Sequence, residues 1–108
     1  MKKVFTLIAL LIPLTLAAQT DVNQRLKEAG LTLPVPGKPM ANYVKAVRTG
    51  NLVYLAGHGP DKGDGTYVTG KLGKDLTVEQ GAEAARLTGL ALLASLQAEI
   101  GDLNKVKR

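Results

Sequence analysis

The feature that most constrains the fold is an uninterrupted helical segment at positions 78–100. It contains no proline and is rich in strong helix formers. Thr77 precedes it and Gln80 lies three positions later, which is the capping-box pattern of a helix N-terminus. Gly101 follows it and is typical of a helix C-terminus. The sequence therefore predicts one long helix over Val78–Ile100.

This helix is apolar on two sides, so it needs two packing partners. A hairpin earlier in the chain provides one partner, and the sequence shows no second one. We therefore expect either a fragment of a larger domain or a small domain that buries its surplus apolar surface by oligomerising. One side carries Ala82, Ala85, Gly89, Leu92, Leu93, Leu96 and Ile100, and the other carries Leu87, Leu90, Ala91, Ala94 and Ala98.

The residues before this helix predict a short helix, an extended segment and a hairpin. Thr20 and Asp21 are good N-cap residues, and Gly30 is typical of a helix end, so we expect a helix over about 21–29. Three prolines make 31–39 extended. Alternating residues at 43–48 and a continuous apolar run at 52–56 predict two paired strands, the second buried on both faces.

The remaining segments carry weaker signals. Positions 57–73 are glycine-rich and predict a loop, with one short strand at 67–69. The glycines lack the spacing of a nucleotide-binding loop. The segment 102–108 resembles the beginning of another strand, after which the chain stops.

The first 18 residues have the layout of a secretory signal peptide. Lys2 and Lys3 are followed by an uncharged run at 4–16 and by small residues at Ala17 and Ala18. As a helix, the run reaches about 20 Å, short of the hydrocarbon core of about 30 Å. We therefore expect a periplasmic or secreted protein that has no membrane contact after cleavage. The alternatives are an uncleaved N-terminal anchor or a buried core helix.

Composition excludes several kinds of site. The chain has no cysteine and one histidine, so a thiolate or poly-histidine metal site is excluded. Four aromatic residues are too few for a base-stacking platform, and the basic residues form no stripe, although the net charge is +5. We expect no nucleic-acid partner.

His58 is the most informative polar residue. It follows the apolar second strand and lies between Gly57 and Gly59, where the backbone can approach a ligand closely. A histidine exchanges protons near neutral pH, so His58 is a candidate acid–base group. The alternative is a turn histidine that hydrogen-bonds to the backbone or to solvent. Tyr43 is a second pocket candidate, with core packing as its alternative.

Several motifs occur together in the order found in a known family. The chain resembles the reactive intermediate deaminase (RidA, formerly YjgF) family, in the branch with a Gly-His/Gln-Gly-Pro turn, over about residues 21–108. The motifs are NYV at 42–44, RTGNLVYLAGHGP at 48–60, GKLGKDLT at 70–77, EAAR at 83–86 and GDL at 101–103.

The resemblance implies a chorismate-mutase-like α/β (α+β) fold, with a mixed sheet backed by helices, of which this chain holds only the N-terminal half. It also implies a homotrimer with ligand clefts between subunits. The family hydrolyses reactive enamines and imines to 2-keto acids and ammonia without a metal or bound cofactor, so the resemblance implies no metal and no cofactor for this chain. On this basis we divide the chain into a signal peptide at 1–18, a helix and proline-rich extension at 19–40, and a RidA-like portion at 41–108.

The resemblance also assigns roles to individual residues. Tyr43 matches the pocket tyrosine, and Gly57 matches the glycine whose backbone lies against the ligand. Ala56 stands where many members have serine, and His58 stands where many have glutamine. The family's carboxylate-binding arginine would lie beyond Arg108. The predicted ligand-binding residues are therefore Tyr43, Gly57, His58 and Gly59, with His58 as the catalytic candidate.

These observations leave three functions open. The first is an exported RidA-like imine or enamine deaminase, or an inactive fragment of one. The second is a non-catalytic module that binds a small ligand or serves assembly. The third and least favoured is an endoribonuclease, against which the lack of a second histidine and of a basic stripe argues.

Overall fold

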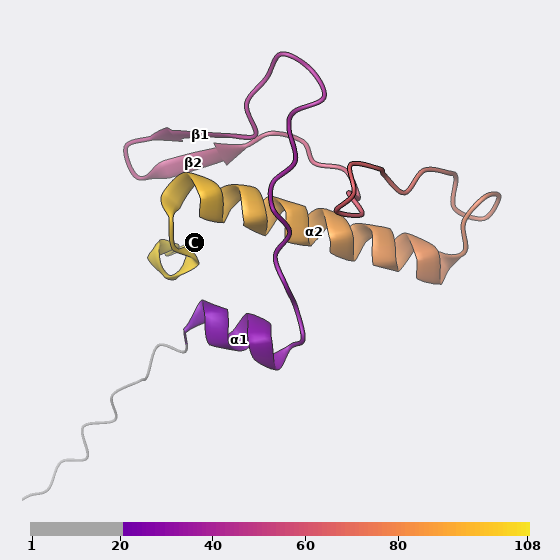
Figure 1. Ribbon diagram of the computed structural model, residues 1–108, viewed down its shortest axis with the longest axis horizontal. Helices are drawn as coiled ribbons and strands as arrows, with labels where there is room; N and C mark the ends of the chain where they lie inside the picture. Colours follow the sequence, from indigo (N-terminus) through magenta and orange to yellow (C-terminus); the bar gives the residue numbers. More distant parts are fainter. Residues whose placement is uncertain (1–20) are drawn as a thin grey trace, which may run out of the picture.

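The computed structural model describes residues 21–108, so the predicted signal peptide at 1–18 lies outside the described residues. The described chain is a small mixed α/β domain with two helices and a two-stranded antiparallel sheet (Figure 1). The elements are α1 (Val22–Glu28), β1 (Ala46–Thr49), β2 (Leu52–Leu55), α2 (Val78–Ile100) and a short 3-10 helix, η1 (Leu103–Lys105).

The long helix α2 has the predicted bounds. The Thr77 hydroxyl accepts a hydrogen bond from the Gln80 backbone N–H at 3.2 Å, and Gln80 Oε1 accepts one from the Thr77 N–H at 2.8 Å. Both halves of the capping box are therefore present. Gly101 ends the helix with a φ of 84°, which is unfavourable for residues with a side chain.

The hairpin β1–β2 lies along the C-terminal half of α2 (Figure 1). Ala46 pairs with Leu55 and Thr49 pairs with Leu52, with Gly50 and Asn51 forming the turn between them. Gly50 has a φ of 56°, as the first position of a type II′ turn requires. The hairpin was predicted, but β1 begins three residues later than expected, so Tyr43 precedes the strand.

The prediction that the second strand is buried on both faces is wrong for the described chain. Its residues alternate between exposed and half-buried, with Leu52 58% and Tyr54 60% exposed. Val53 and Leu55 are half-buried on the opposite face, because that face packs on α2. The outward face has no covering layer among the described residues.

The core is small and is centred on α2. Leu90, Ala91, Ala94 and Ser95 are buried on the helix, and Leu103 of η1 is buried beside it. Three of these helix residues belong to the predicted face that carries Leu90. Ser95 belongs to neither predicted apolar face. The face that carries Leu93 is more open, and Leu93 itself is 36% exposed.

The helix α1 is joined to η1 by side-chain hydrogen bonds. Asn104 Oδ1 accepts from the Val22 N–H at 2.9 Å, and Asn104 Nδ2 donates to Asp21 Oδ1 at 2.9 Å. Asp21 also caps α1 by accepting from the Asn23 N–H. The helix predicted at 21–29 is thus confirmed over Val22–Glu28. These bonds place α1 against the C-terminal end of the described chain.

Two other sequence expectations fail. The segment predicted as a strand at 67–69 contributes only a single bridge between Asp61 and Tyr67. The segment expected to begin a strand at 102–108 instead forms η1, because Asp102 caps it by accepting from the Asn104 N–H at 2.9 Å. Among the residues that the structure describes, no helix is both long and apolar enough to cross a membrane.

Candidate functional site

A recess of about 270 Å³ lies where the chain leaves β2. It combines the segment before β1, the turn after β2, the following loop and the buried face of α2. All four predicted ligand-binding residues line it. The full lining is Met40, Tyr43, Lys45, Gly57, His58, Gly59, Asp61, Tyr67 and Ala91.

His58 is half-buried and hydrogen-bonded through both ring nitrogens. Nδ1 lies 2.7 Å from the carbonyl oxygen of Ala56, and Nε2 lies 2.7 Å from Ser95 Oγ. A carbonyl oxygen can only accept, so Nδ1 carries the proton of the neutral ring. Nε2 then accepts a hydrogen bond from the Ser95 hydroxyl. The tautomer is thus assigned by the hydrogen-bond partners.

The two hydrogen bonds of His58 affect its role as the catalytic candidate. Neither ring nitrogen of His58 is left to bond a ligand while both contacts hold. Proton exchange with a substrate would therefore require the Nε2–Ser95 contact to open. The catalytic role of His58 stays a prediction, whereas its place in the wall of the recess is a structural observation.

Ser95 is the residue that sequence analysis missed. It is 3% exposed on α2 and lies 37 positions after His58. It is flanked by Ala94 and Leu96, within a stretch of α2 at 89–96 that is otherwise apolar. A serine within this apolar stretch is the one available signal, because a hydroxyl that becomes buried needs a hydrogen-bond partner.

Two tyrosines contribute to the recess wall. Tyr43 is 42% exposed and lies ahead of β1. Tyr67 packs against the backbone of Gly59, where a β-carbon would come within 2.9 Å of Tyr67 Cδ1. Gly59 therefore permits the close approach of this ring. A β-carbon at Gly57 would instead meet no atom within 4 Å, so Gly57 faces open space.

Two charged side chains of opposite sign also line the recess. Lys45 and Asp61 are both half-buried. Asp61 Oδ1 accepts a hydrogen bond from the Gly63 N–H at 2.8 Å, which holds the carboxylate in a local turn. Sequence analysis did not single out either residue for this site, because they become neighbours only through the fold.

The described residues contain no group of three side chains arranged to hold a metal ion. The carboxylates whose pKa is displaced, Asp21, Asp64, Glu79 and Glu83, do not line the recess. Hydrogen bonds lower the pKa of each of them. The groups available for chemistry in the recess are therefore an imidazole, two phenols, one ammonium and one carboxylate.

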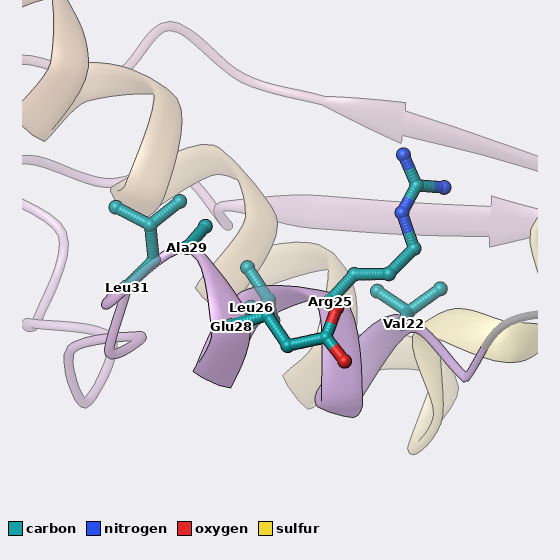
Figure 2. A pocket seen from close by; sticks show the side chains of 6 residues that line it. All are labelled: Val22, Arg25, Leu26, Glu28, Ala29 and Leu31. Carbon is teal, nitrogen blue, oxygen red and sulfur yellow. The ribbon is translucent and has the colours of Figure 1, made fainter.

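A larger groove of about 570 Å³ runs along α1 (Figure 2). Its lining comes only from 22–31, so it brings together no residues that are distant in sequence. It is a groove beside one short helix, whereas the smaller recess collects residues from four segments, three of which contribute polar groups. We therefore take the recess at His58 as the candidate site. The groove is lined by Val22, Arg25, Leu26, Glu28, Ala29 and Leu31.

Comparison with solved structures gives strong matches. A protein from Shewanella oneidensis MR-1 that is provisionally named an endoribonuclease has a TM-score of 0.74 and 33% identity, over 80% of this chain. The protein Atu1372 from Agrobacterium tumefaciens, whose function is unknown, has a TM-score of 0.65 and 40% identity, over 79% of this chain. Both likenesses are consistent with the RidA/YjgF-like fold that the motifs imply.

Comparison with curated proteins gives a match that also covers most of this chain. Protein TCP17 from Trypanosoma cruzi is 37% identical over 95 residues, which are 88% of this chain. No family model matches the chain. The chain spans 59% of TCP17, 57% of the Shewanella protein and 50% of Atu1372. It therefore corresponds to little more than half the length of these proteins.

Proposed function

We propose that the chain belongs to the RidA family and carries one wall of an imine- or enamine-hydrolysing site. The observation that carries this proposal is the convergence of Tyr43, Gly57, His58 and Gly59 on one recess. The family resemblance assigns Tyr43 and Gly57 to ligand binding, and His58 and Gly59 belong to the same turn as Gly57. The four residues come from the two ends of the hairpin. The likeness to the two solved structures supports the same fold.

The proposed reaction is hydrolysis of a protonated 2-imino acid. Water attacks the imine carbon, the new C–O bond forms, and a proton passes from the water to nitrogen. The C–N bond then breaks as the new hydroxyl group loses its proton to the departing ammonia, and a 2-keto acid and an ammonium ion remain. Tyr43 offers a hydroxyl for proton transfer at the recess, and His58 joins it if Nε2 exchanges Ser95 for the reacting group.

Three further properties belong to this proposal. We propose export by the signal peptide at 1–18, assembly as a homotrimer with clefts between subunits, and hydrolysis without a metal or cofactor.

The test is ammonia and keto-acid release from freshly generated 2-iminopropionate. We expect faster release than in buffer alone. Gly57→Ala should lower this rate by about tenfold or more, because its methyl group enters the open space where the ligand backbone contact is proposed. Gly89→Ala, which also points into open space but lies outside the recess, should leave the rate unchanged.

A folded protein that releases ammonia no faster than buffer would refute the deaminase. Ligand binding to the recess without turnover would then favour the second candidate, a non-catalytic binding module. The observation behind that candidate is the pair of hydrogen bonds that engages both nitrogens of His58.

The provisional name of the Shewanella protein favours a ribonuclease as a third candidate. A single-stranded RNA substrate tests it directly. Cleavage that His58→Gln abolishes would support that function over the other two. Intact RNA at equal protein concentration would exclude it.

A further inference from the structure

We propose that Lys45 and Asp61 form a two-point binding site for a small zwitterion. The Lys45 ammonium would bind an anionic group, and the Asp61 carboxylate would bind a cationic group of the same molecule. The ligand class is a free α-amino acid or a molecule with the same charge spacing. A protonated 2-imino acid has the same charge spacing, but this inference goes beyond the proposed function, because it assigns the charged groups that recognise the ligand and includes amino acids that do not react.

The first observation is the position of the two charged atoms around Gly37. A β-carbon placed on Gly37 would lie 3.2 Å from Asp61 Oδ2 and 3.8 Å from Lys45 Nζ. The two charged atoms are therefore at most 7.0 Å apart, the sum of these two distances. They lie beyond the 4.0 Å limit of an ion pair, since they form none in the described chain.

The second observation is that both groups keep binding capacity. Within residues 21–108, the Lys45 ammonium makes no hydrogen bond and no ion pair. The Asp61 carboxylate uses Oδ1 to accept from the Gly63 N–H, while Oδ2 has no hydrogen-bond partner among the described residues and lies beside Gly37. Half-buried charges that are unpaired lose hydration without gaining a partner. A ligand that carries both opposite charges would supply the two missing partners at once.

The third observation is the fit of size. Charge-assisted hydrogen bonds are about 2.7–2.9 Å long. A carboxylate and an amine joined through one carbon atom can therefore bridge charged atoms that are more than 4.0 Å and at most 7.0 Å apart. The recess of about 270 Å³ lies below the range of about 300–1,000 Å³ that is typical of drug-sized ligands. Tyr43 and Tyr67 supply aromatic surface for the short side chain of such a molecule.

The absence of a side chain at Gly37 keeps this space open. A methyl group there would press on Asp61 Oδ2 and lie close to Lys45 Nζ. Gly37→Ala therefore alters the space between the two charges without removing either of them.

The experiment is a titration of the full chain with L-alanine, followed by two-dimensional NMR. Propionate and ethylamine serve as probes that carry only one of the two charges. We expect L-alanine to bind at least about tenfold more tightly than either probe, because only L-alanine engages both groups. The shifted resonances should belong to the segments around Lys45, Gly57 and Asp61.

Three variants test the assignment. Lys45→Gln and Asp61→Asn should each weaken L-alanine binding by about tenfold or more. Asparagine retains the oxygen that accepts from the Gly63 N–H, so the local turn can persist. The matched control is Lys62→Gln, which removes an exposed cation next to Asp61 but outside the recess and should leave binding unchanged.

Equal affinity for L-alanine and propionate would overturn the two-point site, and so would wild-type binding by the Lys45 and Asp61 variants. The proposed hydrolysis is measured separately. A chain that binds L-alanine through these residues but does not hydrolyse 2-iminopropionate keeps this inference and loses the proposed function. A chain that hydrolyses 2-iminopropionate but does not bind L-alanine keeps the proposed function and loses this inference.

Discussion

The Ser95 hydroxyl and His58 Nε2 lie 2.7 Å apart and join the turn after β2 to the buried face of α2. This contact spans 37 positions of sequence and positions one wall of the recess. On the other side of the ring, the Ala56 carbonyl accepts from Nδ1 at 2.7 Å. Two groups of the protein itself, the Ser95 hydroxyl and the Ala56 carbonyl, therefore set the orientation of the imidazole ring.

The first prediction concerns this contact. Ser95→Ala should lower the free energy of unfolding by about 1–3 kcal/mol, because His58 Nε2 is left without its partner in a half-buried position. The higher helix propensity of alanine offsets part of this loss. Urea unfolding followed by circular dichroism measures the difference.

A double-mutant cycle with His58→Ala separates the contact from other effects of each change. We expect a coupling free energy of about 0.5–3 kcal/mol between the two positions. Strictly additive effects would contradict the hydrogen bond.

The second prediction concerns pH and Asp21. The side-chain hydrogen bond from Asn104, followed by the backbone hydrogen bond from Asn23, lowers the pKa of Asp21 below its ordinary value of 3.8. Because the pKa of Asp21 is lower in the folded state than in the unfolded state, the Asp21 carboxylate stabilises the fold above about pH 3.8. This stabilisation is lost as the pH falls through the lowered pKa of the folded state. We therefore expect α1 to detach from η1 in acid, seen as loss of the Val22 and Asn104 amide signals by NMR.

The matched control for this titration is Asp21→Asn. Asparagine is a good N-cap residue but has no carboxyl group to titrate. The same acid transition in this variant would show that another group is responsible.

The third prediction compares two glycines within α2. A β-carbon at Gly89 would meet no atom within 4 Å, whereas one at Gly81 would collide with the side chain of Leu72. Gly89→Ala should therefore stabilise the protein by about 0.5–1 kcal/mol through helix propensity. Gly81→Ala should gain less or lose stability, because Leu72 must move. Thermal unfolding of both variants distinguishes them, and equal effects would argue against the Gly81–Leu72 packing.

The fourth prediction concerns the outer face of the hairpin. Val47, Leu52 and Tyr54 are 51%, 58% and 60% exposed, and they lie together on one face by the strand register. An apolar sheet face of this kind favours association. We expect the described chain to self-associate at micromolar concentration and Tyr54→Lys to reduce that association.

Sedimentation velocity checks this prediction. Val35→Lys changes an apolar residue that is 89% exposed but lies in the proline-rich extension, so it should have little effect. If the unmodified chain is a monomer at micromolar concentration and unfolds cooperatively, the prediction is refuted.

The sequence by itself determined the local elements. The bounds of α2 follow from Thr77, Gln80 and Gly101, because capping and termination depend on residues that are close in the chain. The shorter helix α1 and the turn at Gly50 were predicted for the same reason. The placement of Gly57, His58 and Gly59 after an apolar strand was sufficient to indicate a candidate pocket at that turn.

Only the tertiary structure decided how these elements meet. Leu52 and Tyr54 have the residue types of a buried strand, yet they are exposed, because burial depends on which face packs on α2. The partner of His58 is a serine 37 positions away, and Lys45 and Asp61 become neighbours around Gly37. Such relationships depend on the packing of distant segments, which neither residue periodicity nor local capping encodes.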